Sequence, residues 1–251
     1  MAKVLLLASN VGLWGEELQG PWDALKAAGH EVTLATMQGK TPLPLKWSVD
    51  ADFADPNHNL INPAEIVARV RELVTTGAWD NPIKIEDARM ADYDAIAVIG
   101  GFGAPIDLNG NPAVHRLLID AWQADKTVGA LCYAVGALVL ARQPDDYKKS
   151  IIHGKTIVAH PREWDWVWPL TYELEFTTAD NPGTAITTPG FIYPLRPIVE
   201  GGVGPTGRVI SPPETTREAP STYYDAPFVT GLSFESSAAF GDLMVQVLSG
   251  T

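Results

Sequence analysis

The stretch KTVGALCYAVGALVLARQ, residues 126–143, contains the only cysteine of the chain, Cys132. Its first part, 126–132, is a short apolar run of the kind that forms a strand buried on both faces of a sheet. Its second part, 133–143, is rich in Ala, Leu and Val and is expected to form the helix that this strand feeds. A tight turn between the two needs small neighbours, and the sequence supplies Ala130, Ala134 and Gly136.

Segments predicted as strands and helices alternate along the chain around this stretch. Strands are expected over 3–9, 31–36, 93–101 and 126–132, and helices over 16–30, 63–77, 111–125 and 133–143. Such alternation is typical of an α/β fold with a doubly wound, mostly parallel sheet flanked by helices. Ligands of these folds bind beyond the carboxyl ends of the strands, where Gly101 and Cys132 are both expected.

The part of the chain after this core is less regular. Residues 153–160 could form a strand, and Trp164, Trp166 and Trp168, with Tyr172, could wall an apolar pocket, belong to the core or form a dimer contact. Many Pro, Gly and Thr residues between 181 and 227 predict mostly loops and short β-structure. A last strand, a turn and a C-terminal helix are expected over 226–250. The chain is therefore predicted to be a single α/β domain, 1–251, with a loop-rich insertion around 160–225.

The composition excludes several classes of partner. Hydrophobic residues make up 46% and charged residues 19% of the 251, which is typical of a globular protein. The formal net charge of −12 repels phosphate backbones and anionic membranes, so neither nucleic acid nor a membrane is an expected partner. The N-terminus lacks the long apolar core of a signal peptide, and one cysteine can form no internal disulfide. The expected location is the cytoplasm.

Cys132 has two interpretations. Free cysteine is among the residue types most often buried, so Cys132 could be a small packing side chain. A nucleophile elbow also places its reactive residue between a strand and a helix. The helix dipole and the free N–H groups of such a helix favour thiolate over thiol. The position of Cys132 after a predicted central strand favours the second interpretation.

Three parts of the sequence resemble one family. They are VIGGFGAPIDLNGNPAVHRLLIDAW (98–122) continuing into KTVGALCYAVGALVLA (126–141), GLWGEELQGPWDALKAAGHEVTLAT (12–36), and FVTGLSFESSAAFGDLMVQVL (228–248). They resemble the ThiJ/PfpI superfamily, which is related to the class I glutamine amidotransferases. The resemblance is closest to the branch of cofactor-independent glyoxalases and protein deglycases. In the third part, Phe234 stands where the family usually has Pro.

The resemblance implies that Cys132 is a nucleophile with a carboxyl partner. A Glu shortly before a Pro-aromatic pair points at the thiol in this family, and the matching residue here is Glu17, or Glu16 if the register shifts by one. Such a carboxyl group in a closed pocket should have a raised pKa and could act as general acid and base. Without the resemblance, Glu17 is expected to be an ordinary solvated carboxylate on a helix face.

Backbone N–H groups complete the implied site. Those of Gly101, Phe102 and Tyr133 would face the oxyanion or the substrate, although Gly101 could also belong to a plain turn. Trp14 is a further candidate. Tyr133 and Phe102 are also departures, because the glyoxalase-like branch typically has His directly after the nucleophile and often between the strand-end glycines. His160, after a predicted strand, is the candidate replacement, or else a surface or capping histidine.

The expected function is that of a cofactor-free cysteine enzyme that adds a thiolate to a small electrophilic substrate. Because Tyr133 is a poor base, hydratase or lyase chemistry on an isonitrile or 2-oxoaldehyde ranks slightly above the activity of a glyoxalase or deglycase-like stress protein. The alternative is a redox sensor or chaperone with an oxidisable Cys132. Glutamine amidotransfer is disfavoured, since no His-x-Glu partner is found downstream. No metal and no cofactor are expected, and the resemblance implies a homodimer.

Overall fold

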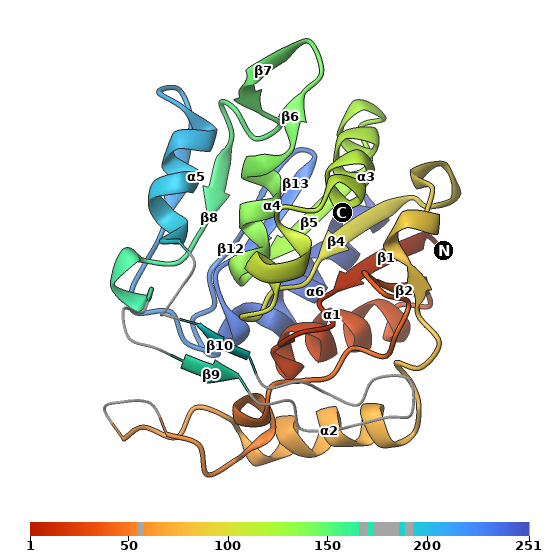
Figure 1. Cartoon of the computed structure of the whole chain (residues 1–251), viewed down its shortest axis with the longest axis vertical. Helices are drawn as coiled ribbons and strands as arrows, with labels where there is room; N and C mark the ends of the chain where they lie inside the picture. Colours follow the sequence, from red (N-terminus) through yellow and green to blue (C-terminus); the bar gives the residue numbers. More distant parts are fainter. Residues whose placement is uncertain (55–57, 166–169, 173–185, 189–192, 251) are drawn as a thin grey trace.

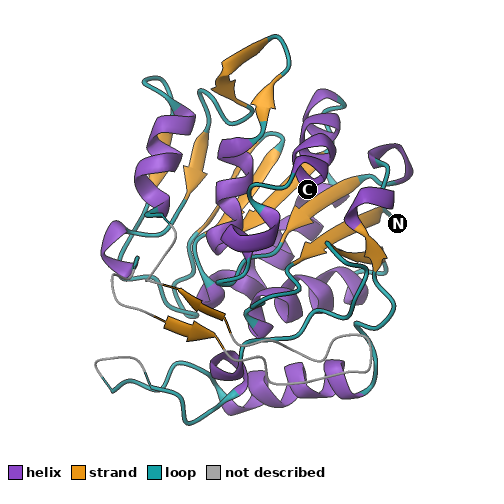
Figure 2. Cartoon of the chain, viewed as in Figure 1, coloured by secondary structure: helices purple, strands orange, loops and turns teal. Residues whose placement is uncertain are grey.

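The computed structural model of the chain describes residues 1–54, 58–165, 170–172, 186–188 and 193–250. It confirms the predicted α/β fold: a mostly parallel sheet runs through the molecule with helices on both of its faces (Figures 1 and 2). Trp166 and Trp168 lie outside the described residues, as does the side chain of Tyr172. Their expected place in a pocket wall, the core or a dimer contact therefore stays a prediction.

The main sheet has seven strands in the order β12-β13-β5-β4-β1-β2-β3. Their bounds are β1 Lys3–Ala8, β2 Glu31–Thr36, β3 Ile83–Lys84, β4 Ala95–Val98, β5 Thr127–Leu131, β12 Thr222–Asp225 and β13 Phe228–Gly231. All neighbouring strands are parallel except β12, which pairs antiparallel with β13. Leu7 pairs with Val98 and Val98 with Ala130, so the carboxyl ends of β1, β4 and β5 meet at one edge.

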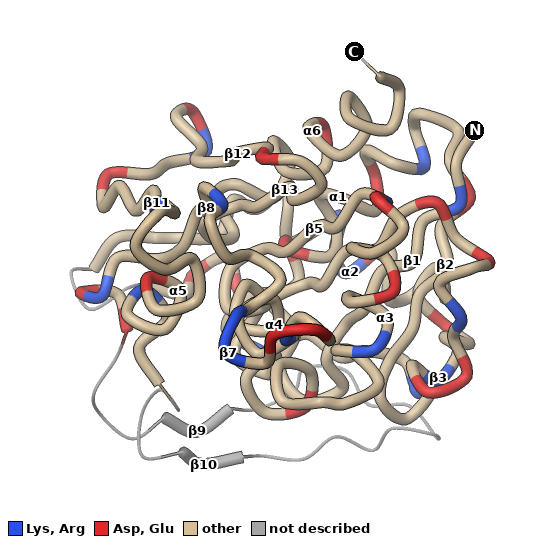
Figure 3. Tube along the Cα trace, turned by 90° about the horizontal axis from the view of Figure 1, so that it is seen from above, with Lys and Arg blue, Asp and Glu red and all other residues tan. Residues whose placement is uncertain are grey.

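Helices cover this sheet in two layers, as Figure 3 shows in a view from above. Helices α1 (Gly15–Ala27) and α6 (Ser237–Ser249) pack against each other on one face, while α3 (Pro112–Gln123) and α4 (Val135–Leu140) lie on the other. The strands between them are buried apolar runs; every residue of β4 and five of the six residues of β1 are buried. This burial on both faces explains why β1, β4 and β5 are continuous hydrophobic stretches rather than alternating ones.

The smaller elements lie beside this core. Strands β8 (Thr156–Val158) and β11 (Arg208–Ile210) form a parallel pair, β6 (Arg142–Gln143) and β7 (Asp146–Ser150) a hairpin, and β9 (Leu170–Tyr172) and β10 (Ile186–Thr188) an antiparallel pair. The side chain of Thr230 on β13 accepts a 3.0 Å hydrogen bond from the Val158 N–H, which ties β8 to the main sheet. His160 lies two positions after the end of β8. The hydrogen bond between Val158 and Thr230 therefore helps to position this candidate site residue.

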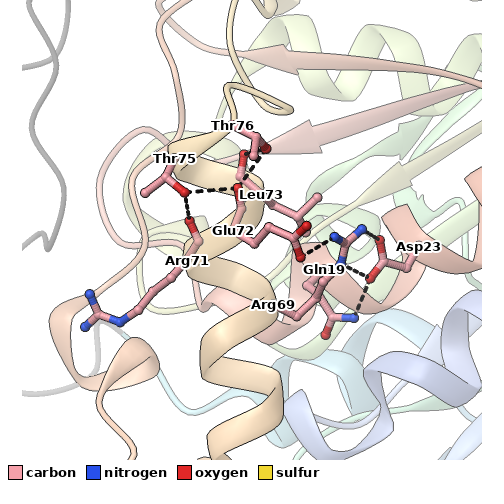
Figure 4. A network of polar contacts seen from close by, with 8 residues as sticks. All are labelled: Gln19, Asp23, Arg69, Arg71, Glu72, Leu73, Thr75 and Thr76. Carbon is pink, nitrogen blue, oxygen red and sulfur yellow. Dashed lines mark hydrogen bonds and ion pairs between the residues drawn. The ribbon is translucent and has the colours of Figure 1, made fainter.

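Helix α2 (Ala64–Thr75) is attached to α1 by a polar network (Figure 4). The guanidinium of Arg69 donates to both carboxylate oxygens of Asp23, at 2.7 and 3.0 Å, and to Glu72 at 2.8 Å. Gln19 donates to the same Asp23. A bidentate arginine–carboxylate contact fixes relative orientation more strictly than a single point contact. The network thus holds α1, which carries Glu16 and Glu17, against α2.

Two expectations about secondary structure were wrong in part. The helix expected over 133–143 covers only Val135–Leu140, since Cys132–Ala134 form a separate 3-10 turn and Arg142–Gln143 enter the β6–β7 hairpin. The loops expected between 181 and 227 are interrupted by α5 (Leu195–Val203). Pro197, Gly201 and Gly202 disfavour helix in isolation, so tertiary packing of α5 on α4 accounts for it.

Among the described residues, none of the helices combines the length and the apolar character needed to cross a membrane.

Candidate active site

Cys132 lies at the junction between β5 and the turn that leads into α4. Its φ is +59°, in the left-handed region that side chains other than glycine rarely adopt. Such strain is typical of residues that the surrounding structure holds for a purpose, and the strand-to-helix turn around a reactive residue is one known setting. The side chain is 5% exposed. The backbone at Cys132 therefore has the conformation of a nucleophile elbow.

Four groups surround the sulfur of Cys132. The imidazole Nε2 of His160 lies 3.1 Å from Sγ. The side chain of Glu17 forms a hydrogen bond with the same sulfur, and the N–H groups of Gly101 and Tyr133 donate to it. These groups come from α1, the end of β4, the turn after β5 and the segment after β8. The sheet edge thus brings together residues that are up to 143 positions apart in the sequence, Glu17 and His160.

The side chain of Glu17 can approach the sulfur because the neighbouring residues at the end of β4 are glycines without a Cβ. A Cβ atom on Gly100 would overlap Oε2 of Glu17 and would lie 2.5 Å from the carbonyl oxygen of Leu131 and 2.7 Å from Cβ of Cys132. At the next position, Gly101 has a φ of +90°, and a Cβ there would overlap the backbone N of Trp14. The two glycines therefore allow the end of β4 to pass between α1 and the elbow.

Burial of the carboxyl group of Glu17 favours its neutral form. Its side chain is 1% exposed. Burial raises its pKa well above the usual range, and the nearby charges of Glu16 and Glu235 raise it further, against the opposing hydrogen bond of Cys132. A neutral carboxyl group beside a thiol can donate its proton to a reacting atom and take it back.

The thiol of Cys132 differs from the sequence-based expectation. A helix N-terminus was expected to favour the thiolate, but burial raises the pKa of Cys132 instead, and the adjacent charge of Glu17 raises it further once Glu17 ionises. The N–H groups of Gly101 and Tyr133 oppose this rise. The physical reason is that the thiol is buried beside a carboxyl group, and burial outweighs the two N–H donors. Attack by this thiol therefore needs a base, and His160 is in reach of its proton.

His160 is buried behind the elbow, 5% exposed, rather than at the surface. Its Nδ1 lies 3.6 Å from Oδ1 of Asp165. The same oxygen accepts a 2.6 Å hydrogen bond from the phenol of Tyr133, and Oδ2 accepts one of 2.7 Å from the N–H of Leu195 at the start of α5. Cysteine, histidine and aspartate thus stand in a row, with the imidazole between the thiol and the carboxylate, as in nucleophile–base–carboxylate triads.

Asp165 was missed in the sequence. It lies between Trp164 and Trp166 in a stretch that favours apolar packing, and 33 positions after Cys132. The available signal was His160 followed five residues later by an acidic residue in an otherwise aromatic segment. That spacing matches no regular element, so only the tertiary structure reveals the contact.

The structure separates the two glutamates that the sequence left as alternatives. Glu16 is turned away from the sulfur and receives two hydrogen bonds from Arg217, at 2.6 and 2.8 Å. Arg217 also donates to the carbonyl oxygen of Ile61 and lies over the ring of Phe234. Glu17, by contrast, contacts Cys132. Arg217 lies in a loop 201 positions from Glu16, and sequence reasoning did not identify it.

Phe102 and Trp14 contribute rings to the surroundings of the site. The Phe102 ring lies 5.9 Å from the ring of Tyr133 and 5.9 Å from that of Trp14. Of the residues implied as oxyanion donors, the structure brings the N–H groups of Gly101 and Tyr133 to the sulfur. Within the described residues, no group of three His, Cys, Asp or Glu side chains is arranged to hold a metal ion.

Comparisons with known proteins agree on the fold. Residues 8–157 match the model of the ThiJ/PfpI family-like family. The chain is similar in structure to the rapid encystment protein 24 kDa of Francisella tularensis, with a TM-score of 0.68, 18% identity and 99% of both chains covered. It is also similar to glyoxalase III from Candida albicans (TM-score 0.64, 19% identity, 97% and 95% covered) and to DJ-1beta of Drosophila melanogaster (TM-score 0.56, 14% identity, 99% and 91% covered). No curated protein sequence matches. At these identities the solved structures show the fold alone.

Proposed function

The chain belongs to the ThiJ/PfpI family-like family, and within it we propose that this protein is a cofactor-free, cysteine-dependent enzyme that acts on a small electrophilic carbonyl compound. The observation that carries the proposal is the 3.1 Å contact between Cys132 Sγ and His160 Nε2, with Glu17 at the same sulfur. A thiol, a base and a neutral acid in one place are what nucleophilic addition followed by proton transfer requires.

A 2-oxoaldehyde is the substrate that suits these groups best. His160 takes the thiol proton while Sγ attacks the aldehyde carbon, and the imidazolium returns that proton to the aldehyde oxygen, which gives a hemithioacetal. His160 then removes the hydrogen on that carbon while Glu17 protonates the ketone oxygen, which gives an enediol. The imidazolium delivers its proton to the former ketone carbon and Glu17 takes back the proton of the other hydroxyl, which gives a thioester of a 2-hydroxy acid. Water cleaves the thioester, which releases the acid and restores the thiol. The N–H groups of Gly101 and Tyr133 would stabilise the oxyanions of the first and last steps.

Hydration of an isonitrile is the second candidate, favoured by the neutral carboxyl group of Glu17 at the sulfur. Addition of the thiolate to the isonitrile carbon, with protonation of that carbon by Glu17, would give a thioimidate. Water would convert the thioimidate to an N-substituted formamide and free the thiol. The reason for ranking this reaction first was the absence of a histidine after Cys132. His160 supplies a base from the segment after β8 and removes that reason.

The proposal is tested by direct turnover assays. The wild type and the variants Cys132→Ala, His160→Asn and Glu17→Gln would be incubated with phenylglyoxal, methylglyoxal and an aryl isonitrile, with detection of the 2-hydroxy acid or the formamide. We expect 2-hydroxy acid from the wild type and at least a hundredfold less from Cys132→Ala. Formamide without 2-hydroxy acid would support the second candidate. Neither product, together with reversible oxidation of Cys132 by peroxide, would support the redox-sensor alternative and overturn the enzyme proposal.

Homodimer formation is a separate proposal that rests on the resemblance to the superfamily. Light scattering coupled to size-exclusion chromatography would give a mass near twice 27.1 kDa if it is right, and a mass near 27.1 kDa would contradict it.

A further inference from the structure

Aromatic side chains extend outward from the elbow in a connected series. Phe102 follows Gly101, whose N–H donates to the reactive sulfur. The ring of Phe102 contacts those of Tyr133, Trp14 and Trp47 at centroid distances of 5.9, 5.9 and 6.3 Å. The series continues through stacked pairs, Trp14 with Phe234 at 4.8 Å and Trp47 with Phe53 at 5.5 Å. The reacting atoms are therefore bordered by aromatic rings.

These rings, which we call the aromatic cluster (Trp14, Trp47, Phe53, Phe102 and Phe234), form a group of their own beside the core of the sheet, and Phe102 also packs against that core. Only Trp14 is fully buried within the cluster, together with Leu45, while the other four rings are partly exposed. Aromatic side chains gathered beside a reactive thiol and incompletely covered offer apolar area that a ligand can bury. Ring-to-ring contacts of this kind contribute binding energy beyond that of the buried area.

The indole N–H of Trp14 is a second, independent observation. Trp14 is 4% exposed, and its Nε1 has no hydrogen-bond acceptor within the described part of the chain. A buried tryptophan N–H usually has a partner, because an unpaired donor is costly. Trp14 precedes Glu17 by one turn, and the Glu17 N–H donates to its carbonyl oxygen at 3.0 Å. An oxygen of a bound substrate would satisfy this donor.

The charges near the site disfavour an anionic ligand. Glu16 and Glu17 are buried near the elbow and Glu235 is half-buried, and the charges of Glu16 and Glu235 both act on Glu17. The cation that faces them, Arg217, already donates to both oxygens of Glu16 and to the Ile61 carbonyl. A carboxylate or phosphate on the substrate would meet like charges without a free guanidinium from Arg217 to pair with.

We propose that the site is specific for an uncharged electrophile that carries an aromatic group, the ring of which packs against Phe102 and Trp14 while the Trp14 indole N–H donates to a substrate oxygen. This inference rests on the proposed function for its reacting carbon, and it identifies an aryl-substituted 2-oxoaldehyde as the substrate class. Small 2-oxoaldehydes with a methyl group in place of the aryl ring would leave the cluster uncovered.

The first experiment compares kcat/KM for phenylglyoxal and methylglyoxal, two neutral 2-oxoaldehydes that differ in the group beside the ketone. We expect the wild type to favour phenylglyoxal at least tenfold. Phe102→Leu should lower that ratio about tenfold, and Trp14→Phe, which keeps a ring but removes the N–H, should raise KM for phenylglyoxal. Trp22→Phe is the control, since Trp22 lies outside the cluster under Lys26, and its ratio should equal that of the wild type.

The second experiment does not depend on turnover. Alkylation of Cys132 by iodoacetamide would be followed with acetophenone, acetone or benzoate present. We expect acetophenone to slow alkylation of the wild type, to slow that of Phe102→Leu several-fold less, and to act far more strongly than acetone or benzoate. Protection without turnover would mean that the proposed function is wrong while the ligand class is right. A ratio near one in the first experiment, or equal protection by acetone, acetophenone and benzoate, would overturn the inference.

Discussion

The phenol of Tyr133 donates a 2.6 Å hydrogen bond to Oδ1 of Asp165, the same oxygen that lies 3.6 Å from Nδ1 of His160. The imidazole and the phenol therefore compete for one acceptor, and in this structure the phenol has it. Nδ1 of His160 is buried without another partner among the described residues. Tyr133, directly after the nucleophile, is not itself a base. It affects the base His160 by occupying the Asp165 oxygen that the imidazole would otherwise use.

Removal of the phenol should release Asp165 to His160. In Tyr133→Phe, the N–H of the imidazole can take Oδ1 of Asp165, which stabilises the positive imidazolium that forms when Cys132 loses its proton. We expect the pH midpoint of Cys132 alkylation by iodoacetamide to fall in Tyr133→Phe and to rise in Asp165→Asn. Tyr193→Phe, which removes another largely buried hydroxyl that is bonded to Asn109, is the matched control. Equal midpoints in all four proteins would contradict a role for Asp165 in positioning the base.

Replacement of Glu17 should separate thiol reactivity from turnover. At pH values high enough to ionise Glu17, its charge raises the pKa of Cys132, so Glu17→Gln, which cannot ionise, should shift the alkylation midpoint to lower pH. The same variant lacks the proton that the reaction uses, so its kcat should fall at least tenfold. Glu16→Gln is the comparison, because Glu16 faces Arg217 and not the sulfur; it should move the midpoint less. A midpoint that rises or stays unchanged in Glu17→Gln would show that Glu17 is not coupled to the thiol.

The sequence predicts the frame of this site well, for local physical reasons. Buried parallel strands are continuous apolar runs, so β1, β4 and β5 stand out, and their carboxyl ends place Gly101 and Cys132 at one edge. The resemblance supplied Glu17, with an uncertainty of one position. The structure resolves that uncertainty through helix geometry: adjacent residues of α1 point about 100° apart, so when Glu17 faces the sulfur, Glu16 faces Arg217.

The remainder of the site could not be predicted because it depends on contacts between distant segments. Asp165 contacts Tyr133 and lies beside His160, and Arg217 contacts Glu16. No local periodicity in the sequence links the members of these pairs. The same holds for α5, which contains residues of poor helix propensity and is stabilised by packing on α4. The direction of the Cys132 pKa was also misjudged, because a strand-to-helix turn in the sequence does not reveal how deeply the thiol is buried beside Glu17.

Gly100→Ala should damage both stability and activity. The added Cβ would overlap the Glu17 carboxyl group and would approach the Leu131 carbonyl to 2.5 Å, and the second of these is backbone that cannot move aside cheaply. Overpacking of this kind costs about 1–3 kcal/mol of unfolding free energy. Urea unfolding would measure the loss. Gly110→Ala has open space around its Cβ and should change the unfolding free energy by less than about 0.5 kcal/mol. Similar losses in the two variants would mean that the close approach at Gly100 is not the cause.

Asp107 should make stability depend on pH. Burial raises its pKa from 3.8 to about 6, against the opposing hydrogen bonds from Asn10 and Ser9. The unfolded chain therefore releases this proton near pH 3.8, whereas the folded protein keeps it to about pH 6. The folded state binds more protons in that window, so the contribution of Asp107 to the unfolding free energy is complete below about pH 3.8 and declines as the pH rises to about 6. A shift of this size corresponds to about 3 kcal/mol.

The measurement is urea unfolding of the wild type and Asp107→Asn between about pH 4 and about pH 7.5. Asparagine can still accept the hydrogen bond that the Asn10 N–H donates to Asp107 at 2.9 Å, and it does not ionise, so the stability of the variant lacks this one contribution to the pH dependence. We expect the wild type to lose up to about 3 kcal/mol relative to the variant as the pH rises across this range. Other titrating groups, Glu17 and Glu235 included, are present in both proteins and cancel in the difference. A difference that stays constant with pH would mean that Asp107 ionises in the folded protein as readily as in the unfolded chain.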